Sequence, residues 1–239
     1  MGRIEEAFAR RAAENRKVLV TYLCVGDPDA DASTALSLAC AEEGADILEL
    51  GCPFSDPTAD GVAIARASQR ALAKGGGLDA TLAVARAVRA RSEVPIVLFG
   101  YYNPLFVRGE EAAARGIGIV PLVAPTTTTE RVARIAEVAE THPVPFVYYV
   151  SMTGVTGGSG ASDVLATAAS QAGRVREVTR RPTVVGFGID NAERARVAAR
   201  QADGVVVGSE IVRRIERGET PEARLASVRE LVREIRGAV

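Results

Sequence analysis

The stretch "ADILELGCPFSDPTADG", residues 45–61, decides how this sequence is interpreted. Ile47, Leu48 and Leu50 form the apolar run of a short buried strand, and Glu49 lies among them. Burial of an unpaired carboxylate is costly, and no Lys or Arg lies nearby in the sequence. Glu49 is therefore either a functional acid or a structural acid paired with a distant arginine. Ionisable groups in strongly perturbing, apolar surroundings concentrate at functional sites, which favours the first interpretation.

Similar apolar runs alternate with amphipathic stretches along the 239 residues. Strands rich in Val, Ile and Leu, without polar alternation, are typical of a parallel sheet covered by helices. The order predicts an α/β fold, a TIM-type (β/α) barrel, with an open doubly wound sheet as the alternative. The seven runs predicted as strands are Val18–Val25, Asp46–Leu50, Pro95–Gly100, Ile117–Ala124, Pro145–Val150, Thr183–Gly188 and Gly204–Gly208.

Amphipathic patterns predict the helices. Ile4, Phe8 and Ala12 give the N-terminal segment an apolar stripe suited to covering the bottom of a barrel. Further helices are predicted around Val132–Ala139, ending near His142, and around Leu225–Ile235. No interdomain linker interrupts the pattern, so we expect a single domain over residues 1–239.

Turn signals separate these elements. Asp31 or Ser33 is expected to cap the first crossover helix, with Gly44 just beyond its end. "KGGGLD", residues 74–79, predicts a turn between two helices, and "TGVTGGSGAS", residues 153–162, predicts a mobile loop.

Composition excludes several classes of function. A net charge of -1 argues against nucleic acid and anionic membrane surfaces as partners. No apolar run approaches the roughly 20 residues of a membrane helix, and the charged N-terminus argues against a secretory signal. The odd number of cysteines indicates reduced thiols and a cytoplasmic protein. His142 is the single histidine, so Cys–His and Ser–His–Asp catalysis and a His-rich metal site are disfavoured. No metal is expected, and carboxylates remain for the chemistry.

In a barrel, the reactive groups gather where strands run out into the following loops. Glu49 would lie at that rim, where desolvation raises its pKa and makes it a candidate proton donor. Asp56 and Asp60 follow in the next loop, but "SDP" and "ADG" are good turn sequences, and alone both aspartates are better interpreted as turn formers.

Two late strands end in glycine-containing turns, at Val184–Asp190 and Gly204–Val212. Single glycines usually mark turns, yet two such turns before helix starts favour a phosphate site, to which Ser209 can add a hydroxyl. Aromatic residues at strand ends either pack in the core or line an apolar pocket. They are Tyr22, Phe99, Tyr101, Tyr102 and Tyr148.

Five motifs together resemble the α subunit of tryptophan synthase. In chain order they are "LELGCPFSDPTADG", "YYNP", "VSMTGVTG", "GFGI" and "GSEIV". The similarity runs from the N-terminal helix to the C-terminal helix, and the first motif is long and specific. The resemblance implies a lyase of tryptophan biosynthesis that cleaves indole-3-glycerol phosphate to indole and glyceraldehyde 3-phosphate, a retro-aldol reaction with no cofactor in this subunit.

The resemblance also implies roles for individual residues. Glu49 matches the catalytic glutamate that handles the proton on the indole, and Asp60 matches the aspartate that stabilises positive charge at the indole nitrogen. Asp56 stays a structural residue. Substrate-binding positions are Tyr148, Thr156, Tyr22 and Phe99. Phosphate-holding positions are Gly157, Gly188, Gly208 and Ser209.

A partner follows from the same resemblance. The family passes indole to a β subunit that carries pyridoxal phosphate, in a heterotetramer of the α2β2 type. The Phe54–Gly61 loop matches part of the contact surface with that subunit.

The sequence departs from the family between Pro104 and Ile117, where only 12 residues, "LFVRGEEAAARG", are found. A βαβ unit takes about 30 residues, so one strand–helix unit of the eight is expected to be missing. We expect a contracted or opened barrel, less stable than its relatives. Three alternatives stay open: a non-catalytic or impaired partner that docks on a β subunit, a shortened chain that folds poorly, and another phosphosugar enzyme on the same scaffold.

Overall fold

The computed structural model describes residues 2–58, 60–101, 118–150, 161–186 and 188–239. The chain divides into two compact units. Unit 1 comprises Met1–Val18, Gly109–Val206 and Ala238–Val239, and unit 2 comprises Leu19–Arg108 and Val207–Gly237. Each unit has its own parallel strands and helices, and the single domain expected from the sequence stays a prediction.

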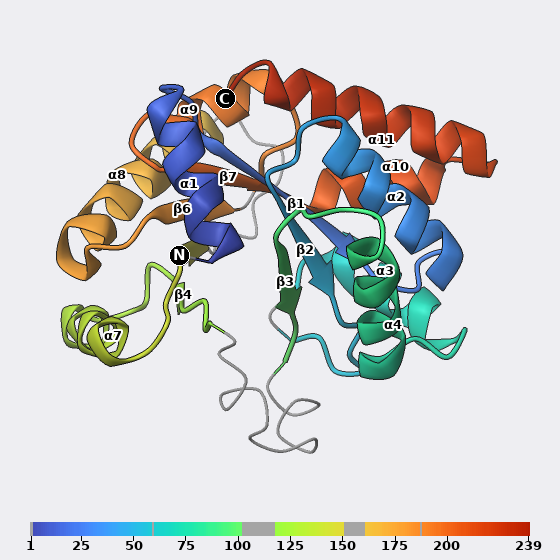
Figure 1. The fold of residues 1–239 in the computed structure, drawn as a ribbon, viewed down its shortest axis with the longest axis horizontal. Coiled ribbons are helices and arrows are strands. Elements are labelled where there is room, and N and C mark those ends of the chain that lie inside the picture. Colours follow the sequence, from blue (N-terminus) through green and yellow to red (C-terminus); the bar gives the residue numbers. More distant parts are fainter. Residues whose placement is uncertain (1, 59, 102–117, 151–160, 187) are drawn as a thin grey trace. The chain divides into compact units, whose positions relative to one another are not determined.

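Unit 2 is built on three parallel strands in the order β3-β2-β1. They are β1 (Val18–Cys24), which enters the unit at Leu19, β2 (Ile47–Gly51) and β3 (Ile96–Phe99). Figure 1 shows these strands side by side, with α11 along α2 and α10. The helices are α2 (Ala30–Glu42), α3 (Val62–Leu72), α4 (Leu78–Arg89), α10 (Ser209–Arg217) and α11 (Pro221–Arg236).

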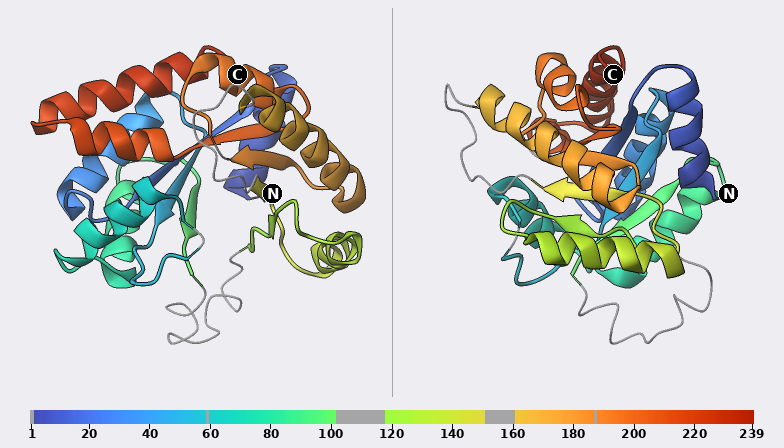
Figure 2. Two further views of the ribbon diagram at one scale, coloured as in Figure 1. Left: turned by 180° about the vertical axis from the view of Figure 1, so that it is seen from behind. Right: turned by 90° about the vertical axis from the view of Figure 1, so that its left-hand side faces the viewer.

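Unit 1 contains four parallel strands in the order β7-β6-β5-β4. They are β4 (Leu122–Val123), β5 (Val147–Val150), β6 (Thr183–Gly186) and β7 (Gly204–Val207), whose last residue belongs to unit 2. Figure 2 shows α7 and α8 packed side by side in this unit. Its helices are α1 (Arg3–Ala13), α7 (Thr129–Thr141), α8 (Ala161–Thr179) and α9 (Ala192–Ala199).

The seven expected strands are all found in the described part of the chain. The run predicted at Ile117–Ala124 forms only the two-residue strand β4 there. Pro121 precedes this strand and has no N–H to donate to a neighbouring strand, which limits its pairing. The short helix that residues 109–115 were expected to allow lies outside the described residues.

The N-terminal helix is confirmed. Its Phe8 ring lies 5.6 Å from the ring of Phe146, the residue before β5. Because strands of a parallel sheet start at one edge, α1 lies at the amino end of β5, as expected for a bottom cover. The helices ending at His142 and containing Leu225–Ile235 are confirmed as α7 and α11.

The cap of α2 differs from the expectation. Asp29, and neither Asp31 nor Ser33, accepts a hydrogen bond from the backbone N–H of Ala32, at 2.8 Å. Ser33 lies one turn into the helix, where its hydroxyl donates to the Asp29 carbonyl oxygen at 2.7 Å. The helix begins earlier than predicted because an extended Asp29 satisfies the first free N–H groups.

The expected turns are confirmed where they are described. Gly44 follows α2 with φ of +100°, a conformation open chiefly to glycine. Of the turn predicted at residues 74–79, residues 74–77 lie between α3 and α4, and α4 begins at Leu78. Of the loop predicted at residues 153–162, the first eight residues lie outside the described part of the chain, and α8 begins at Ala161.

Two ion pairs hold the ends of the unit 2 strands. At the amino end, Arg236 of α11 lies 2.7 Å from the buried carboxylate of Asp46, which also accepts from the Leu19 N–H at 3.0 Å. At the carboxyl end, Arg70 of α3 donates twice to Asp27, at 2.9 and 2.8 Å. The second pair fixes α3 over the end of β1, beside the residues discussed next.

Candidate active site

Glu49 is the third residue of β2, and its side chain is buried with 2% exposed. Burial raises its pKa to about 8, and no charged neighbour contributes to the shift. The structural alternative of a distant arginine partner therefore finds no support among the described residues. A carboxyl group in this state holds its proton at neutral pH, as a general acid must.

Tyr22 and Phe99 enclose the region beside Glu49. Tyr22 and Glu49 are paired in the β1–β2 register, so their side chains share one face of the sheet. The Tyr22 and Phe99 rings meet edge to face, with centroids 5.8 Å apart. A Cβ atom at Gly51 would lie 2.3 Å from the Tyr22 hydroxyl, so only glycine leaves room for this ring.

The start of α10 reaches the same ring. Gly208 precedes α10, and a Cβ atom there would lie 3.1 Å from Cβ of Tyr22. Ser209 is the first residue of the helix, whose free N–H groups and dipole attract anions. The structure therefore brings three predicted site residues of unit 2, Tyr22, Phe99 and Gly208, close to Glu49 or to one another, and Ser209 follows Gly208 in the chain.

Asp60 lies in the loop between β2 and α3 and is half-buried. Burial raises its pKa, while a hydrogen bond from the Tyr101 hydroxyl opposes this shift. The Tyr101 ring stacks on Phe54, with centroids 4.7 Å apart. Asp56 in the same loop is exposed. The carboxyl group of Asp60 is therefore partly desolvated and hydrogen-bonded to Tyr101, whereas Asp56 is exposed to solvent.

Tyr101 is a residue whose contact with Asp60 the sequence did not reveal. It was recognised only as one of five aromatic residues near strand ends. The signal that could have located it is the β2–β3 register, which pairs Gly51 with Phe99 and so brings the chain after β3 beside the loop after β2.

In unit 1 the structure describes two of the predicted site residues, Tyr148 and Gly188. Tyr148 of β5 lies over Gly186 of β6, where a Cβ atom would meet the tyrosine hydroxyl at 2.2 Å. Gly188 follows β6 with φ of +68°, a conformation that favours glycine. Thr156 and Gly157 lie outside the described residues.

The thiols offer no nucleophile. Burial raises the pKa of Cys24 and of Cys40 to about 12, and it also raises the pKa of Cys52. In the described part of the chain, no cluster of three or more His, Cys, Asp or Glu residues is arranged to hold a metal. No described helix is long and apolar enough to cross a membrane.

Parallel strands that alternate with helices, with a buried acid near the carboxyl end of one strand and a helix start after another, define an enzyme of the (β/α)-barrel class. The chain belongs to the tryptophan synthase alpha chain family, whose family model matches residues 8–115 and 110–239. The family places the chain among the lyases of tryptophan biosynthesis.

Individual relatives agree with this assignment. The tryptophan synthase alpha chain of Geobacter sulfurreducens is 43% identical over 247 aligned positions, which cover 91% of each chain. The tryptophan synthase subunit alpha of Legionella pneumophila superposes with a TM-score of 0.84 at 30% identity, over 100% of this chain and 98% of that one. A chain of Mycobacterium tuberculosis tryptophan synthase gives 0.81 at 32% identity, over 100% of both.

The comparisons also bear on the shortened stretch. The alpha chain of Burkholderia thailandensis is 39% identical over 270 aligned positions that include 100% of this chain. The alignment therefore exceeds this 239-residue chain by about 30 positions, the size of one strand–helix unit. The two segments of the family match meet at residues 110–115, inside the stretch that was identified as short.

Proposed function

We propose that this chain cleaves indole-3-glycerol phosphate to indole and glyceraldehyde 3-phosphate. The observation that carries the proposal is the buried Glu49 carboxyl, whose pKa is raised to about 8 by burial alone. Glu49 donates a proton to C3 of the indole, and the bond from C3 to the glycerol carbon then breaks. The electron pair of that bond returns to the ring, while the hydroxyl on the glycerol carbon gives its proton to the Glu49 carboxylate left by the first step as the aldehyde forms.

Asp60 assists the same step in this proposal. Protonation of C3 places positive charge at the indole nitrogen, and an ionised carboxylate stabilises that charge. The hydrogen bond from Tyr101 favours the ionised form of Asp60. Tyr22 and Phe99 are proposed to flank the ring of the substrate, which their edge-to-face packing beside Glu49 supports.

Phosphate binding is proposed for Gly208 and Ser209 at the start of α10, because N–H groups at a helix start suit an anion. Gly157 and Gly188 are proposed to hold the phosphate with them, and Tyr148 and Thr156 are proposed to bind the rest of the substrate, on the strength of the family motifs. This proposal includes the assumption that both units complete a single barrel domain.

The partner is proposed to be a tryptophan synthase β subunit that holds pyridoxal phosphate, in an α2β2-type complex in the cytoplasm. The family supports this proposal, as does the M. tuberculosis chain, which comes from a structure of tryptophan synthase. Nothing in the comparisons favours the alternative of a non-catalytic docking protein.

The test is indole release from indole-3-glycerol phosphate by purified protein, with and without a β subunit, between pH 6 and 10. The rate is expected to fall as pH rises through about 8, because the proton donor is then lost. Glu49→Gln should lower turnover by about 10³-fold. Turnover close to the unsubstituted rate in this variant, or a rate that stays constant through pH 8 to 10, contradicts the role of Glu49.

A further inference from the structure

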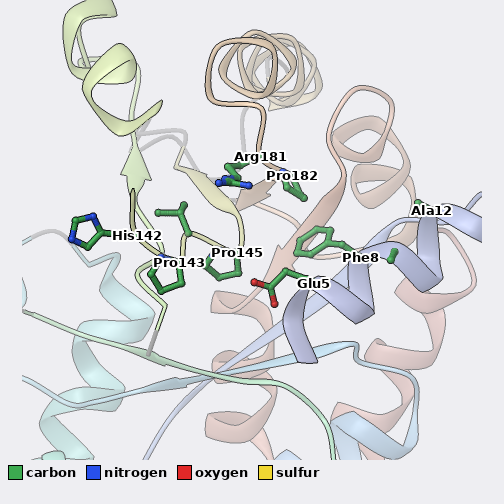
Figure 3. Close-up of a pocket in the computed structure, with 10 residues that line it drawn as sticks. Glu5, Phe8, Ala12, His142, Pro143, Pro145, Arg181 and Pro182 are labelled. Atoms are coloured by element: carbon green, nitrogen blue, oxygen red, sulfur yellow. The ribbon is translucent and has the colours of Figure 1, made fainter. Parts of the chain in front are cut away.

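Figure 3 shows a hollow in unit 1, where Glu5 and Phe8 project from α1 toward Pro145. Pro145 comes shortly before β5, so the hollow lies at the amino ends of the strands, whereas Gly188 follows the carboxyl end of β6. The loops at the carboxyl ends form the active site of a (β/α) barrel. A residue that positions the proposed site is therefore expected near those ends, and in unit 2 Arg70 lies there.

Arg70 of α3 uses every nitrogen of its guanidinium group in an ion pair. Nε and Nη2 donate to the two carboxylate oxygens of Asp27, at 2.9 and 2.8 Å, in the paired geometry that arginine forms and lysine does not. Nη1 donates to Glu216 of α10 at 2.6 Å. Asp27 is buried just after β1, and Glu216 is exposed. One side chain therefore connects the loop after β1, helix α3 and helix α10.

This bridge lies beside an apolar contact between α3 and α10. Ala67 of α3 and Val212 of α10 belong to one buried cluster, which also contains Tyr22. Val212 and Glu216 are four residues apart, and Ala67 and Arg70 are three apart, so each pair shares one face of its helix. The ion pair therefore continues the packed contact between the two helices toward the end of α10.

Both helices begin at residues of the proposed site. α3 begins at Val62, two residues after Asp60, and α10 begins at Ser209, directly after Gly208. Both are short, with 11 and 9 residues, so a shift of the contact between them also moves their first turns. Binding groups must be held to about 0.5 Å by the residues that support them. The Arg70 bridge is in a position to provide this support.

We propose that Arg70 is a positioning residue, which fixes the start of α10 for phosphate binding through its ion pair with Glu216. Asp27 holds the guanidinium group in place, and the remaining nitrogen holds α10 against α3. Arg70 acts through α10 and does not contact the substrate in this role. The inference rests on the phosphate site proposed above for Gly208 and Ser209.

Glu216→Ala tests the bridge, because it removes the α10 contact and leaves the buried pair of Arg70 with Asp27 intact. The KM for indole-3-glycerol phosphate should rise about two- to fivefold, within what an exposed ion pair contributes, and kcat should change little. Glycerol 3-phosphate carries the phosphate without the indole, and calorimetry should show it binding more weakly by a similar factor. A rise in kcat and KM together, or no rise in KM, contradicts the positioning role.

The sign of the effect separates positioning from electrostatics. Glu216→Ala removes a negative charge, and by Coulomb attraction alone this change would strengthen the binding of an anion. Glu219→Ala is the matched control, because Glu219 is exposed beyond the end of α10 and the variant removes the same charge. The control should leave phosphate binding unchanged or slightly tighter. Binding of glycerol 3-phosphate that is unchanged or tighter in Glu216→Ala overturns the inference.

Arg70→Lys shows whether the two residues act as one bridge. An ammonium group lacks the rigid fork of donors that holds two carboxylates at once, so KM should rise at least as much as in Glu216→Ala. In the double variant the two effects should not add, because each substitution breaks the same contact. Additive effects would show that Arg70 and Glu216 act separately. If Arg70→Lys fails to fold, Glu216→Ala and its control decide alone.

The two readouts distinguish failure of this inference from failure of the proposed function. A protein that binds glycerol 3-phosphate but releases no indole refutes the reaction, and the calorimetry of Glu216→Ala still tests the bridge. Indole release with unchanged KM and unchanged binding in Glu216→Ala refutes the bridge and leaves the reaction standing. A protein that does not bind glycerol 3-phosphate refutes the phosphate site and the role of Arg70 with it.

Discussion

The two units share one packing arrangement at the ends of their strands. In unit 2, Tyr22 pairs with Glu49 in the register and its ring covers Gly51, two residues further along β2. In unit 1, Tyr148 pairs with Val184 and its ring covers Gly186, again two residues further along the neighbouring strand. A Cβ atom on the glycine would lie 2.3 Å from the tyrosine hydroxyl in unit 2 and 2.2 Å in unit 1.

The difference between the units lies at the position beside the tyrosine. Val184 is fully buried and Glu49 is 2% exposed, so both positions are sealed from water. Burial stabilises an apolar valine, whereas the same burial raises the pKa of Glu49 to about 8. The proposed proton donor therefore occupies a position that is otherwise suited to core packing. Its raised pKa, and with it the proton it holds at neutral pH, follows from its burial.

Replacement of Glu49 by Val makes unit 2 resemble unit 1 and should have the largest effect. We expect indole release to fall by about 10³-fold, because general acid catalysis commonly contributes 10² to 10⁴. Steady-state assays of Glu49→Val measure this loss. Asp56→Asn is the matched control, since Asp56 is exposed in the following loop, and it should retain nearly full activity. A similar loss in both variants would mean that the lower rate comes from impaired folding and not from the loss of the Glu49 carboxyl group.

The same substitution should change how stability depends on pH. The folded-state pKa of Glu49, about 8, lies above its ordinary value of 4.5. The folded protein therefore holds the Glu49 proton more tightly than the unfolded chain, and its contribution to stability is greatest below pH 4.5 and is lost as pH rises through about 8. Urea unfolding from pH 5 to 9 should show a loss of a few kcal/mol, at up to about 1.4 kcal/mol per pH unit. Glu49→Val should lack this part of the slope. Equal slopes for the two proteins would argue that Glu49 is not desolvated.

The glycines under the tyrosine rings provide a test of similar design in both units. Gly51→Ala and Gly186→Ala should each destabilise the protein by about 1–3 kcal/mol, because the added methyl group forces the ring to move. Gly51→Ala is expected to lower activity more than Gly186→Ala, since the Tyr22 ring lies beside the proposed proton donor Glu49, whereas Tyr148 is proposed only to bind substrate. Urea unfolding and indole release measure the two effects.

Double variants check the cause of that destabilisation. Tyr22→Leu in Gly51→Ala, and Tyr148→Leu in Gly186→Ala, remove the ring that the methyl group meets. The added cost of each alanine should then become much smaller. An unchanged cost would point to a backbone effect and would end the proposed equivalence of the two units.

Much of this arrangement could be predicted from the sequence, because local patterns determine it. The apolar run around Glu49 predicted β2, and the absence of a nearby basic residue predicted a perturbed acid. Gly44 was placed correctly because a positive φ after a helix favours glycine. These features depend on residues that are neighbours in the chain.

The features that escaped prediction depend on contacts between distant segments. Asp29 caps α2, and the sequence offered Asp31 and Ser33 as equally good candidates because capping depends on which residue is extended. Tyr22 can cover Gly51 only because β1 and β2 pair in a register that places Tyr22 beside Glu49, which lies 27 residues further along the chain. The support of Asp60 by Tyr101 likewise depends on the pairing of β2 with β3.

The smallest expected effect belongs to Tyr101→Phe, which removes the hydrogen bond to Asp60 and keeps the ring on Phe54. The contact lies outside the arrangement of tyrosine and glycine that the two units share, so the variant tests a feature of unit 2 alone. The hydrogen bond lowers the pKa of Asp60, and its loss should raise that pKa. If ionised Asp60 assists the reaction, the acidic limb of the rate profile should move to higher pH. At neutral pH we expect a loss of about three- to tenfold, which corresponds to about 0.6–1.4 kcal/mol, within the range for a single hydrogen bond. Phe54→Leu keeps the hydroxyl and removes the stacked ring, so it should shift the limb less. A profile with an unchanged acidic limb in Tyr101→Phe would show that Asp60 does not need this donor.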